Sequence, residues 1–388
     1  MALNMEDGKL ELNEATCSAP GKIFWIGAYA ILHKGNVAHV LAVDKRIKAN
    51  AIKENENKIT VDVPQFNIKV HGFFDKENKL VKFQNLSNEE ENKIKFVKAA
   101  IETTFKYLTS KGKEVKGLRL TTTHDAAFAP VGDLKTGLGS SAAVTVATIA
   151  AIMSLYGYDI NKDEDKEVIH KLSQYSHSVA QGKVGSGFDI ATACYGCIKY
   201  ERYSPEIINE ELPYVIDKPW DYVIEKVPFP KKFLVLLAFT GESASTTEMV
   251  KKVMAYAKQH QEEYNKLIKE MNEKNKEAIN YLIELNKHFD NKTLENFRKA
   301  FEEGRIFLKK LGELSNAEIE SDKYSFLIEE IKKKGAFLAK LPGAGGGDSL
   351  FVVCLNEKSR KNVGHFLKEK GLQLLDVEIS DEGVRKEE

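Results

Sequence analysis

The feature that most constrains this chain is a glycine-serine run, KTGLGSSAA at Lys135–Ala143, which leads directly into an alanine-rich helical stretch. Because Gly137 and Gly139 lack a Cβ atom, backbone N–H groups can turn toward a ligand there. The unpaired N–H groups of the first helical turn and the helix macrodipole attract phosphate. The hydroxyls of Ser140 and Ser141 can bind phosphate or Mg²⁺. The alternative is a serine-capped turn that only reverses the chain.

Two other nucleotide-binding patterns fit this run less well. Part of it matches the dinucleotide pattern GxGxxA, which belongs after the first strand of a βαβ unit, with an acidic residue about twenty positions on. Here the run lies deep in the chain, and Asp159 falls in a polar stretch, YGYDINKDED. A Rossmann site is therefore disfavoured. The pattern GxxxxGK[ST] and the protein-kinase motifs do not occur in the sequence, which excludes those two classes.

A lysine near the start of the chain and a second glycine-rich stretch near its end are further candidates for ligand binding. In SAPGKIFWIGAY, Lys22 follows Pro-Gly and precedes an apolar strand, so it could reach a phosphate from a rigid turn, although an exposed turn lysine is the commoner case. In LPGAGGGDS, at Leu341–Ser349, four glycines in five residues exceed the needs of a hairpin. They favour close approach of the backbone to a ligand, with a flexible loop as the alternative.

A fourth segment, AQGKVGSGFDIA at 180–191, places Lys183 and Asp189 on either side of a glycine turn. Asp189 can be a helix N-cap. It can also act in a cleft as an acid, a base or a group that orients a charge.

Composition narrows the class of protein. The chain has 388 residues, 57 Lys plus Arg against 57 Asp plus Glu, and 43% hydrophobic residues, which fits a two-domain globular protein and argues against broad nucleic-acid binding.

Cys194 and Cys197 form a CxxC without a second metal-binding pair, so buried free thiols are favoured over a redox or zinc site. No basic leader with an apolar core opens the sequence, and the longest apolar stretch, 142–155, is too short to span a bilayer. We therefore expect a cytoplasmic enzyme.

Periodicity predicts a mixed α and β chain, with the domain junction in the proline-rich stretch 204–230. Strands are predicted at 17–31, 37–52, 58–70, 118–123, 198–203, 233–239, 335–341, 350–355 and 372–379. Helices are predicted at 88–111, from the glycine-serine run to about 156, at 163–182, 188–195 and 323–334, and from 357. Two or three long charged helices are predicted over 245–287 and 294–314.

The four segments occur in the order typical of the GHMP kinases, named for galactokinase, homoserine kinase, mevalonate kinase and phosphomevalonate kinase. APGKIFWIGAYA resembles the first motif of this family, KTGLGSSAA the second and LPGAGGGDS the third, over residues 18 to about 355. The resemblance implies two α+β domains with the active site in the cleft between them. It implies an N-terminal domain (1–225) like domain 2 of ribosomal protein S5, and a ferredoxin-like C-terminal domain (226–388).

Within the family, the sequence is most similar to the phosphomevalonate kinases, on AQGKVGSGFDIATACYG, PWDYVIEKVPFP and FTGESASTTEMV. This implies ATP and Mg²⁺ as cofactors and transfer of the γ-phosphoryl group to (R)-5-phosphomevalonate. The implied catalytic residues are Lys22, Lys135 and Asp189. The implied ATP-binding residues are Lys135, Gly137, Leu138, Gly139, Ser140, Ser141 and Ala142. The implied substrate-binding residues are Lys22, Lys183, Ser186, Gly187, Arg202, Gly345, Gly346 and Gly347.

Two features depart from the mevalonate kinases of the family. Those enzymes have an HGxPSGxDN-like run with a Glu just upstream, whereas this chain has Gln181. Ser141 or Ser140 is therefore the only Mg²⁺ ligand that the resemblance carries over.

A phosphomonoester acceptor is largely dianionic at pH 7, since its second pKa is about 6. We therefore expect Asp189 to orient Lys22 and the substrate rather than to remove a proton.

Three alternatives stay open at this point. One is a GHMP kinase with an alcohol acceptor, such as mevalonate kinase, and another is diphosphomevalonate decarboxylase. The third is a catalytically silent relative that senses a ligand. The sequence leaves the oligomeric state open as well, with a homodimer as one option and no nucleic-acid or membrane partner expected.

Overall fold

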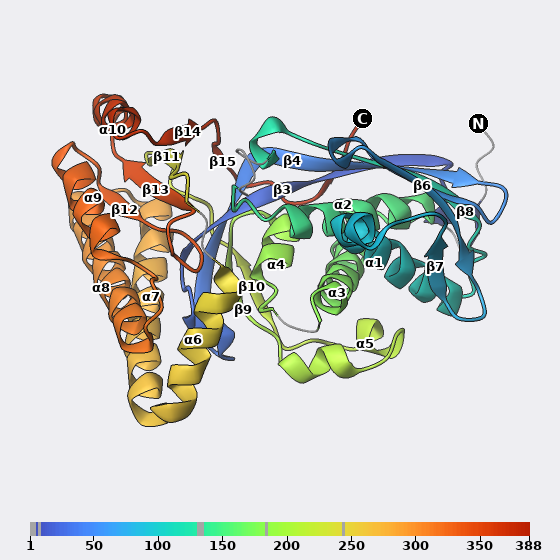
Figure 1. Ribbon diagram of the computed structural model, residues 1–388, viewed down its shortest axis with the longest axis horizontal. Coiled ribbons are helices and arrows are strands. Elements are labelled where there is room, and N and C mark those ends of the chain that lie inside the picture. Colours follow the sequence, from blue (N-terminus) through green and yellow to red (C-terminus); the bar gives the residue numbers. More distant parts are fainter. Residues whose placement is uncertain (1–4, 7–8, 130–135, 183–184, 243–244) are drawn as a thin grey trace.

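The computed structural model describes residues 5–6, 9–129, 136–182, 185–242 and 245–388. Two sheets, each covered by helices, lie side by side along the long axis of the molecule (Figure 1). The fold is the two-domain α+β arrangement expected from the sequence.

The first sheet is built around one long strand. Strand β4 pairs with β3 along one edge and with β8 and β9 at successive positions. The described strands of this sheet are β3 (Glu14–Ile26), β4 (Val37–Glu54), β5 (Ile59–Val63), β6 (Ile68–Asp75), β7 (Leu80–Phe83), β8 (Gly117–His124), β9 (Ile198–Glu201), β10 (Val223–Lys226), β15 (Ile379–Ser380) and β16 (Arg385–Lys386). A separate short pair, β1 (Met5–Glu6) and β2 (Lys9–Leu10), precedes it.

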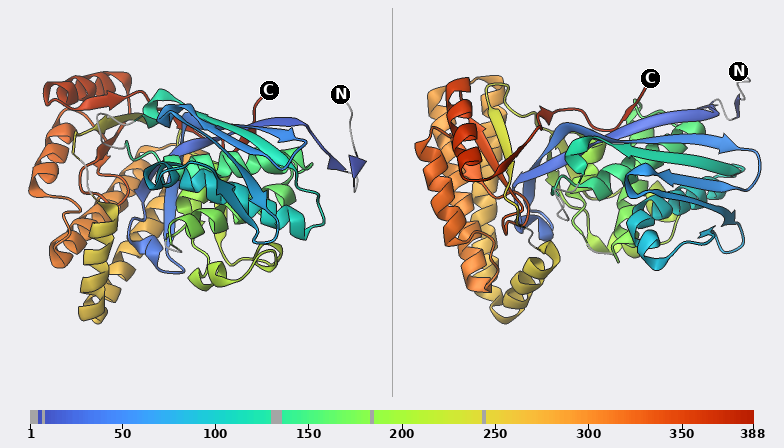
Figure 2. Two further views of the ribbon diagram at one scale, coloured as in Figure 1. Left: turned by 45° about the vertical axis from the view of Figure 1, so that its right-hand side comes forward. Right: turned by 45° about the horizontal axis from the view of Figure 1, so that its top comes forward.

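Helices cover one face of this sheet (Figure 2). They are α1 (Asn88–Ser110), α2 (Ser140–Leu155), α3 (Asp163–Ala180) and α4 (Phe188–Tyr195), with the short α5 (Tyr214–Asp217) beyond them. Helix α2 lies at the centre, against β3, β4, α1, α3 and α4, and every one of its residues after Val144 is buried. Its small alanines allow this close approach. The helix that follows the glycine-serine run is therefore anchored in the core at its far end.

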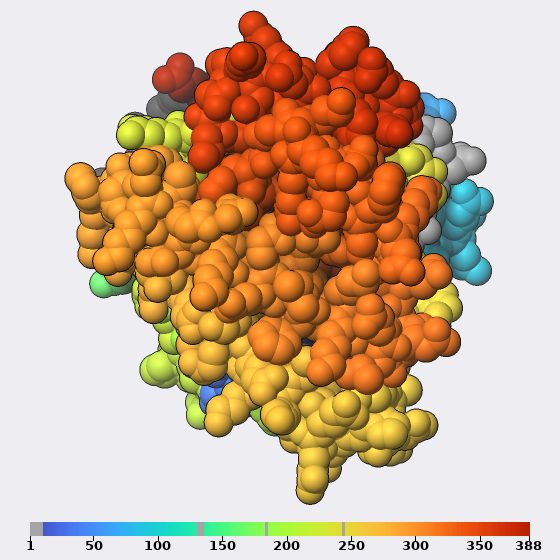
Figure 3. Space-filling view, turned by 90° about the vertical axis from the view of Figure 1, so that its left-hand side faces the viewer, coloured from blue at the N-terminus to red at the C-terminus, as the bar shows by residue number. Residues whose placement is uncertain are grey.

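The second sheet has the order β12-β13-β11-β14. With helices between β11 and β12 and between β13 and β14, this is the βαββαβ order of a ferredoxin-like unit. The elements are β11 (Leu234–Phe239), α6 (Thr246–Gln259), α7 (Gln261–Lys287), α8 (Asn291–Ser315), α9 (Asp322–Lys333), β12 (Leu338–Lys340), β13 (Ser349–Cys354), α10 (Glu357–Glu369) and β14 (Gln373–Leu375). Residues of α6 to α10 form most of the face seen in Figure 3.

The chain returns to the first sheet at its end. β15 pairs with β4, and β16 pairs with β3. The division into 1–225 and 226–388 stays a prediction. We propose that residues 379–386 be counted with the first domain.

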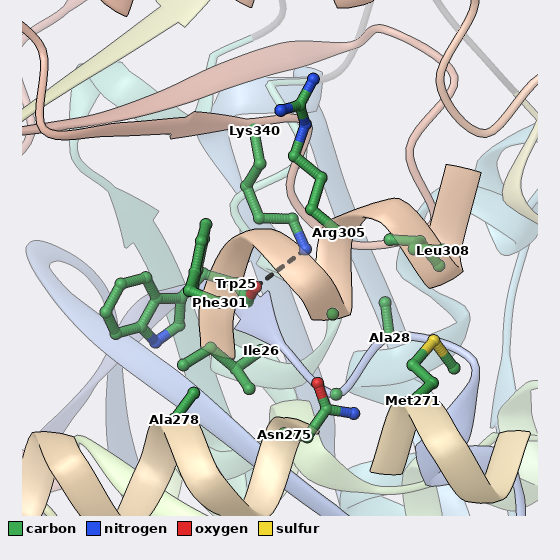
Figure 4. Close-up of a pocket in the computed structure, with 12 residues that line it drawn as sticks. Trp25, Ile26, Ala28, Met271, Asn275, Ala278, Phe301, Arg305, Leu308 and Lys340 are labelled. Atoms are coloured by element: carbon green, nitrogen blue, oxygen red, sulfur yellow. Dashed lines mark hydrogen bonds between the residues drawn. The ribbon is translucent and has the colours of Figure 1, made fainter. Parts of the chain in front are cut away.

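An aromatic cluster joins the two halves. The indole of Trp25 on β3 lies 5.5 Å from Phe301 and 5.7 Å from Phe351, measured between ring centroids. Beside it, the buried ammonium of Lys340 donates a hydrogen bond of 2.8 Å to the carbonyl oxygen of Trp25 (Figure 4). Trp25 lies where the register of β3 shifts against β4, so this carbonyl faces the second domain and not the ladder.

Most predicted elements are confirmed, and three predicted strands differ from the structure. The strand predicted at 372–379 is two short strands, β14 in the second sheet and β15 in the first, because the chain crosses between the domains there. The strand predicted at 17–31 ends at Ile26 because Gly27 has φ +102°, and a Cβ there would lie 2.5 Å from the carbonyl oxygen of Val37. The single strand predicted at 58–70 is wrong. Pro64 begins a 3-10 turn (Pro64–Phe66) that divides it into β5 and β6, because proline cannot donate to a ladder.

The cysteines are free thiols, as predicted. Cys194, Cys197, Cys17 and Cys354 are all buried and unbridged. Burial raises the pKa of Cys194 and of Cys197, so both stay protonated at neutral pH. Within the described residues, no group of three or more His, Cys, Asp or Glu side chains is placed to hold a metal ion. None of the described helices combines the length and apolarity that crossing a membrane requires.

Candidate functional site

Lys22 connects the first two glycine segments. Its backbone N–H donates to the carbonyl oxygen of Leu138 at 2.8 Å, and its Nζ donates to the carbonyl oxygen of Gly137 at 2.8 Å. Gly139 lies against the same side chain, since a Cβ there would be 3.0 Å from Cγ of Lys22. Residues 137–139 of the predicted phosphate loop therefore pack around Lys22.

The loop places the start of α2 beside this ammonium group. Gly139 is the N-cap residue, in the left-handed region with φ +79° and ψ +40°, and no side chain caps the helix among the described residues. Ser140 is exposed and Ser141 is partly buried, whereas Leu138 and Ala142 point into the core. The first N–H groups of α2 are therefore available to a ligand, as an anion site at a helix N-terminus requires.

The third glycine segment closes the opposite side of the cleft. A pocket between the two domains is lined by Lys22, Thr136–Leu138 and Pro342–Gly345, together with Asp348. The N–H of Gly343 donates to the carbonyl oxygen of Phe24 at 2.7 Å, which fixes this loop to β3 two residues beyond Lys22. Three segments that lie far apart in the sequence thus form one cleft.

The glycines of this third segment serve different purposes. A Cβ on Gly345 would lie 2.2 Å from the carbonyl oxygen of Ile319, and one on Gly347 would lie 2.6 Å from the ring of Tyr324. Both residues also have positive φ, as does Gly346, whose N–H donates to Ile319. Packing against the protein therefore accounts for Gly345 and Gly347, and positive φ accounts for Gly346. Their predicted contact with substrate stays a prediction. The position of a Cβ on Gly343, by contrast, is open.

Asp189 lies in the first turn of α4, and its charge acts on two neighbours. Burial lowers the pKa of Lys22, and the carboxylates of Asp189 and Asp348 oppose that effect. Burial also lowers the pKa of His177, and Asp189 opposes this shift too. Asp189 therefore lies within electrostatic range of both Lys22 and His177.

His177 was not predicted from the sequence. Its Nε2 lies 3.1 Å from Oγ of Ser141, and its ring stacks on Phe96 with 5.0 Å between centroids. Gln174 and His177 on α3 and the C-cap residue Gln181 follow one another at helical spacing. A polar face of this kind on a largely buried helix is the sequence signal that could have identified His177. His177 holds the hydroxyl of Ser141 in place at the start of α2.

The remaining predicted residues divide into two groups. Ser186 and Gly187 are buried in the loop before α4, and Arg202 donates to the carbonyl oxygens of Leu32 and Gly185 at 2.8 and 3.0 Å. Their predicted contact with substrate stays a prediction. Lys135 and Lys183 lie outside the described residues.

The cleft and the sheet order agree with two family comparisons. Residues 95–197 match the GHMP kinases N terminal domain, and residues 246–373 match the GHMP kinases C terminal family. The chain belongs to the GHMP kinases.

Phosphomevalonate kinases are among its full-length relatives. The phosphomevalonate kinase of Saccharolobus solfataricus is 32% identical over 373 residues, which cover 95% of this chain and 98% of the relative. The mevalonate kinase of Thermococcus onnurineus is 28% identical, covering 96% and 98%. Among solved structures, the phosphomevalonate kinase of Streptococcus pneumoniae in complex with phosphomevalonate and AMPPNP superposes with a TM-score of 0.73 at 21% identity, covering 94% of this chain and 99% of that one.

Proposed function

We propose that the protein transfers the γ-phosphoryl group of ATP to the phosphate of (R)-5-phosphomevalonate, giving (R)-5-diphosphomevalonate and ADP. In this reaction the bond between the γ-phosphorus and the β,γ-bridging oxygen breaks, and a bond to an oxygen of the acceptor phosphate forms. The observation that carries the proposal is the cleft where Lys22, the Thr136–Leu138 loop that leads into α2 and the Pro342–Gly345 loop meet. The full-length phosphomevalonate kinase relative supports this choice of acceptor.

The chain's own groups supply positioning and positive charge. Phosphoryl transfer depends mainly on both. Backbone N–H groups of Gly137–Ser141 bind the ATP phosphates, and Lys22 supplies an ammonium group next to Gly137. Lys135 and Lys183 add cations for the acceptor phosphate in this proposal.

Mg²⁺ fits the donor set at the start of α2. Mg²⁺ prefers oxygen ligands and is usually held by one or two protein groups together with substrate phosphates and water. The hydroxyl of Ser141, or of Ser140, supplies such an oxygen, so a cluster of three protein ligands is not required. When bound with ATP, the ion neutralises phosphate charge.

Asp189 orients the reacting groups in this proposal and does not remove a proton. The acceptor phosphate is already largely dianionic at neutral pH, because its second pKa is about 6. The carboxylate of Asp189 favours the charged form of Lys22, against the effect of burial on the pKa of that lysine, and this supports an orienting role.

Mevalonate kinase is the second candidate, because the relative from Thermococcus onnurineus also spans the whole chain. It would require proton removal from an alcohol, a step suited to Asp189 as a base. Gln181, in place of the upstream Glu, argues against it. A homodimer stays a prediction under either function.

A panel of acceptors separates these functions. ADP release would be measured by a coupled assay with phosphomevalonate, mevalonate, homoserine and galactose, and CO₂ release would be measured with diphosphomevalonate. We expect turnover with phosphomevalonate alone. Preferred turnover of mevalonate, CO₂ release, or no turnover of any acceptor would overturn the proposal in favour of the kinase, the decarboxylase or the sensor.

A further inference from the structure

Three consecutive backbone carbonyl groups just before α4 each accept a hydrogen bond from a buried side chain. Such a run is unusual in a loop, where carbonyl groups commonly face solvent. The pairs are Arg202 Nη2 to Gly185 at 3.0 Å, Tyr200 Oη to Ser186 at 2.8 Å and Gln174 Nε2 to Gly187 at 2.7 Å.

The donors come from rigid elements on two sides of the loop. Tyr200 lies on β9 with none of its surface exposed, and Gln174 on α3 is 2% exposed. Arg202, just after β9, also donates to the carbonyl oxygen of Leu32, at the end of the segment that follows Lys22. The loop before Asp189 is therefore fixed to the sheet, to α3 and to the 3-10 turn Ala30–Leu32.

These bonds determine the direction in which α4 begins. In a trans peptide the carbonyl group and the following N–H point in opposite directions, so three held carbonyls also orient the next three N–H groups. Gly187 has φ +77°, and a Cβ there would lie 2.3 Å from Oε1 of Gln174, so the backbone and this amide are in close contact. Since Asp189 is the second residue of α4, a tilt of the helix start moves its carboxylate directly.

We propose that Tyr200 is a positioning residue for Asp189, and that its hydroxyl, with Gln174 and Arg202, holds the Asp189 carboxylate at its distance from Lys22. This inference rests on the role proposed above for Asp189. Buried groups outside the cleft thereby keep Asp189 and Lys22 in position beside the phosphate loop.

Tyr200→Phe tests this with the loss of one oxygen atom. The variant leaves the buried carbonyl group of Ser186 without a hydrogen bond, and the free-energy cost of this is large enough to shift the loop. We therefore expect kcat to fall about tenfold and the KM for ATP to change less than twofold. Tyr107→Phe is the matched control. Tyr107 is also buried, and its hydroxyl donates a hydrogen bond of 3.2 Å to Oδ1 of Asp217, away from the loop. It should leave kcat unchanged at a comparable loss in Tm.

A double-mutant cycle separates positioning from general stability. Combined with Asp189→Asn, Tyr200→Phe should lower kcat by less than a further twofold, because the carboxylate it positions is already absent. Multiplying losses would overturn the proposal, because independent effects combine in that way.

A second readout does not depend on the acceptor. The reaction rate of Lys22 with an amine reagent, followed by peptide mass spectrometry across pH, reports its titration. Displacement of Asp189 should shift this titration to lower pH in Tyr200→Phe but not in Tyr107→Phe. An unchanged titration would overturn the positioning role, whatever the acceptor panel shows. Failure of phosphomevalonate turnover in the wild type would overturn only the proposed function.

Discussion

The ammonium group of Lys22 donates a hydrogen bond to the carbonyl oxygen of Gly137, 2.8 Å away. This bond joins a strand of the first sheet to the loop that begins α2, although the two residues are 115 positions apart. Because the backbone N–H of Lys22 also donates to Leu138, the side chain and main chain of one residue hold two successive loop carbonyls. The loop geometry and the position of this cation are therefore interdependent.

Gly139→Ala tests that interdependence. Its φ of +79° strains any L-residue by about 1–2 kcal/mol, and the new methyl group would also press on Cγ of Lys22. We expect a loss of stability of that size together with a fall in kcat of at least about tenfold, measured by denaturant unfolding and steady-state kinetics. Gly112→Ala is the control, since its φ is +77° and no atom lies within 4 Å of its Cβ position. It should lose similar stability and keep its kcat. Equal kcat losses in both variants would contradict the coupling to Lys22.

Ser141→Ala should weaken the binding of Mg²⁺. The hydroxyl of Ser141 is held by His177 at 3.1 Å, so it is pre-oriented, whereas that of Ser140 is exposed. We expect the Mg²⁺ concentration for half-maximal rate to rise about tenfold in Ser141→Ala. Ser140→Ala is the matched control and should change it less. The reverse order would place the ion on Ser140.

Asp189→Asn distinguishes an orienting carboxylate from a base. We expect kcat to fall about 100-fold, as for a misplaced reacting group. The rise of kcat with pH, set by the second ionisation of the acceptor near pH 6, should persist in the variant. The measurement is kcat across pH for both proteins. A rising limb that is present in the wild type and lost in the variant would establish Asp189 as the base.

Lys340→Met predicts a pH-dependent change in stability. Burial lowers the pKa of Lys340 from 10.5 to about 8, so between these values the unfolded chain holds a proton that the folded chain has released. Stability from this group therefore rises with pH across that window, by about 3 kcal/mol in total. The wild-type free energy of unfolding, minus that of the variant, should rise accordingly. Lys358→Met, at an exposed position, is the control. A difference that stays flat from pH 8 to 10.5 would contradict the burial of a charged Lys340.

The elements with strong local signals were predictable from sequence. Helix α1 is one, because Ser87 and Glu90 form a capping box and its apolar side chains, which include Ile94, Ile101 and Leu108 at helical spacing, are buried. Strand β7 (Leu80–Phe83) was missed because it is short and lies at a sheet edge. Strand β16 was missed because its two exposed residues carry no periodic pattern, and its pairing with β3 is a long-range contact.

The site was predictable where glycine chemistry marks it and not where buried donors support it. The segments around Lys22, Gly139 and Gly343 were found because each combines a glycine with a polar group. Tyr200 and His177 act through contacts with residues 14 and 36 positions away, and single-residue patterns carry no sign of such pairings. The packing role of Gly345 likewise depends on the carbonyl group of Ile319, which only the fold brings near.

Phosphorus NMR of the reaction tests the central claim most directly, because it follows the acceptor phosphate itself. With ATP, Mg²⁺ and (R)-5-phosphomevalonate, the account predicts that the monoester signal disappears and that two coupled diphosphate signals replace it, in step with ADP formation. The account would be contradicted if this monoester signal persisted and if, in a parallel reaction with mevalonate as the acceptor, mevalonate were phosphorylated.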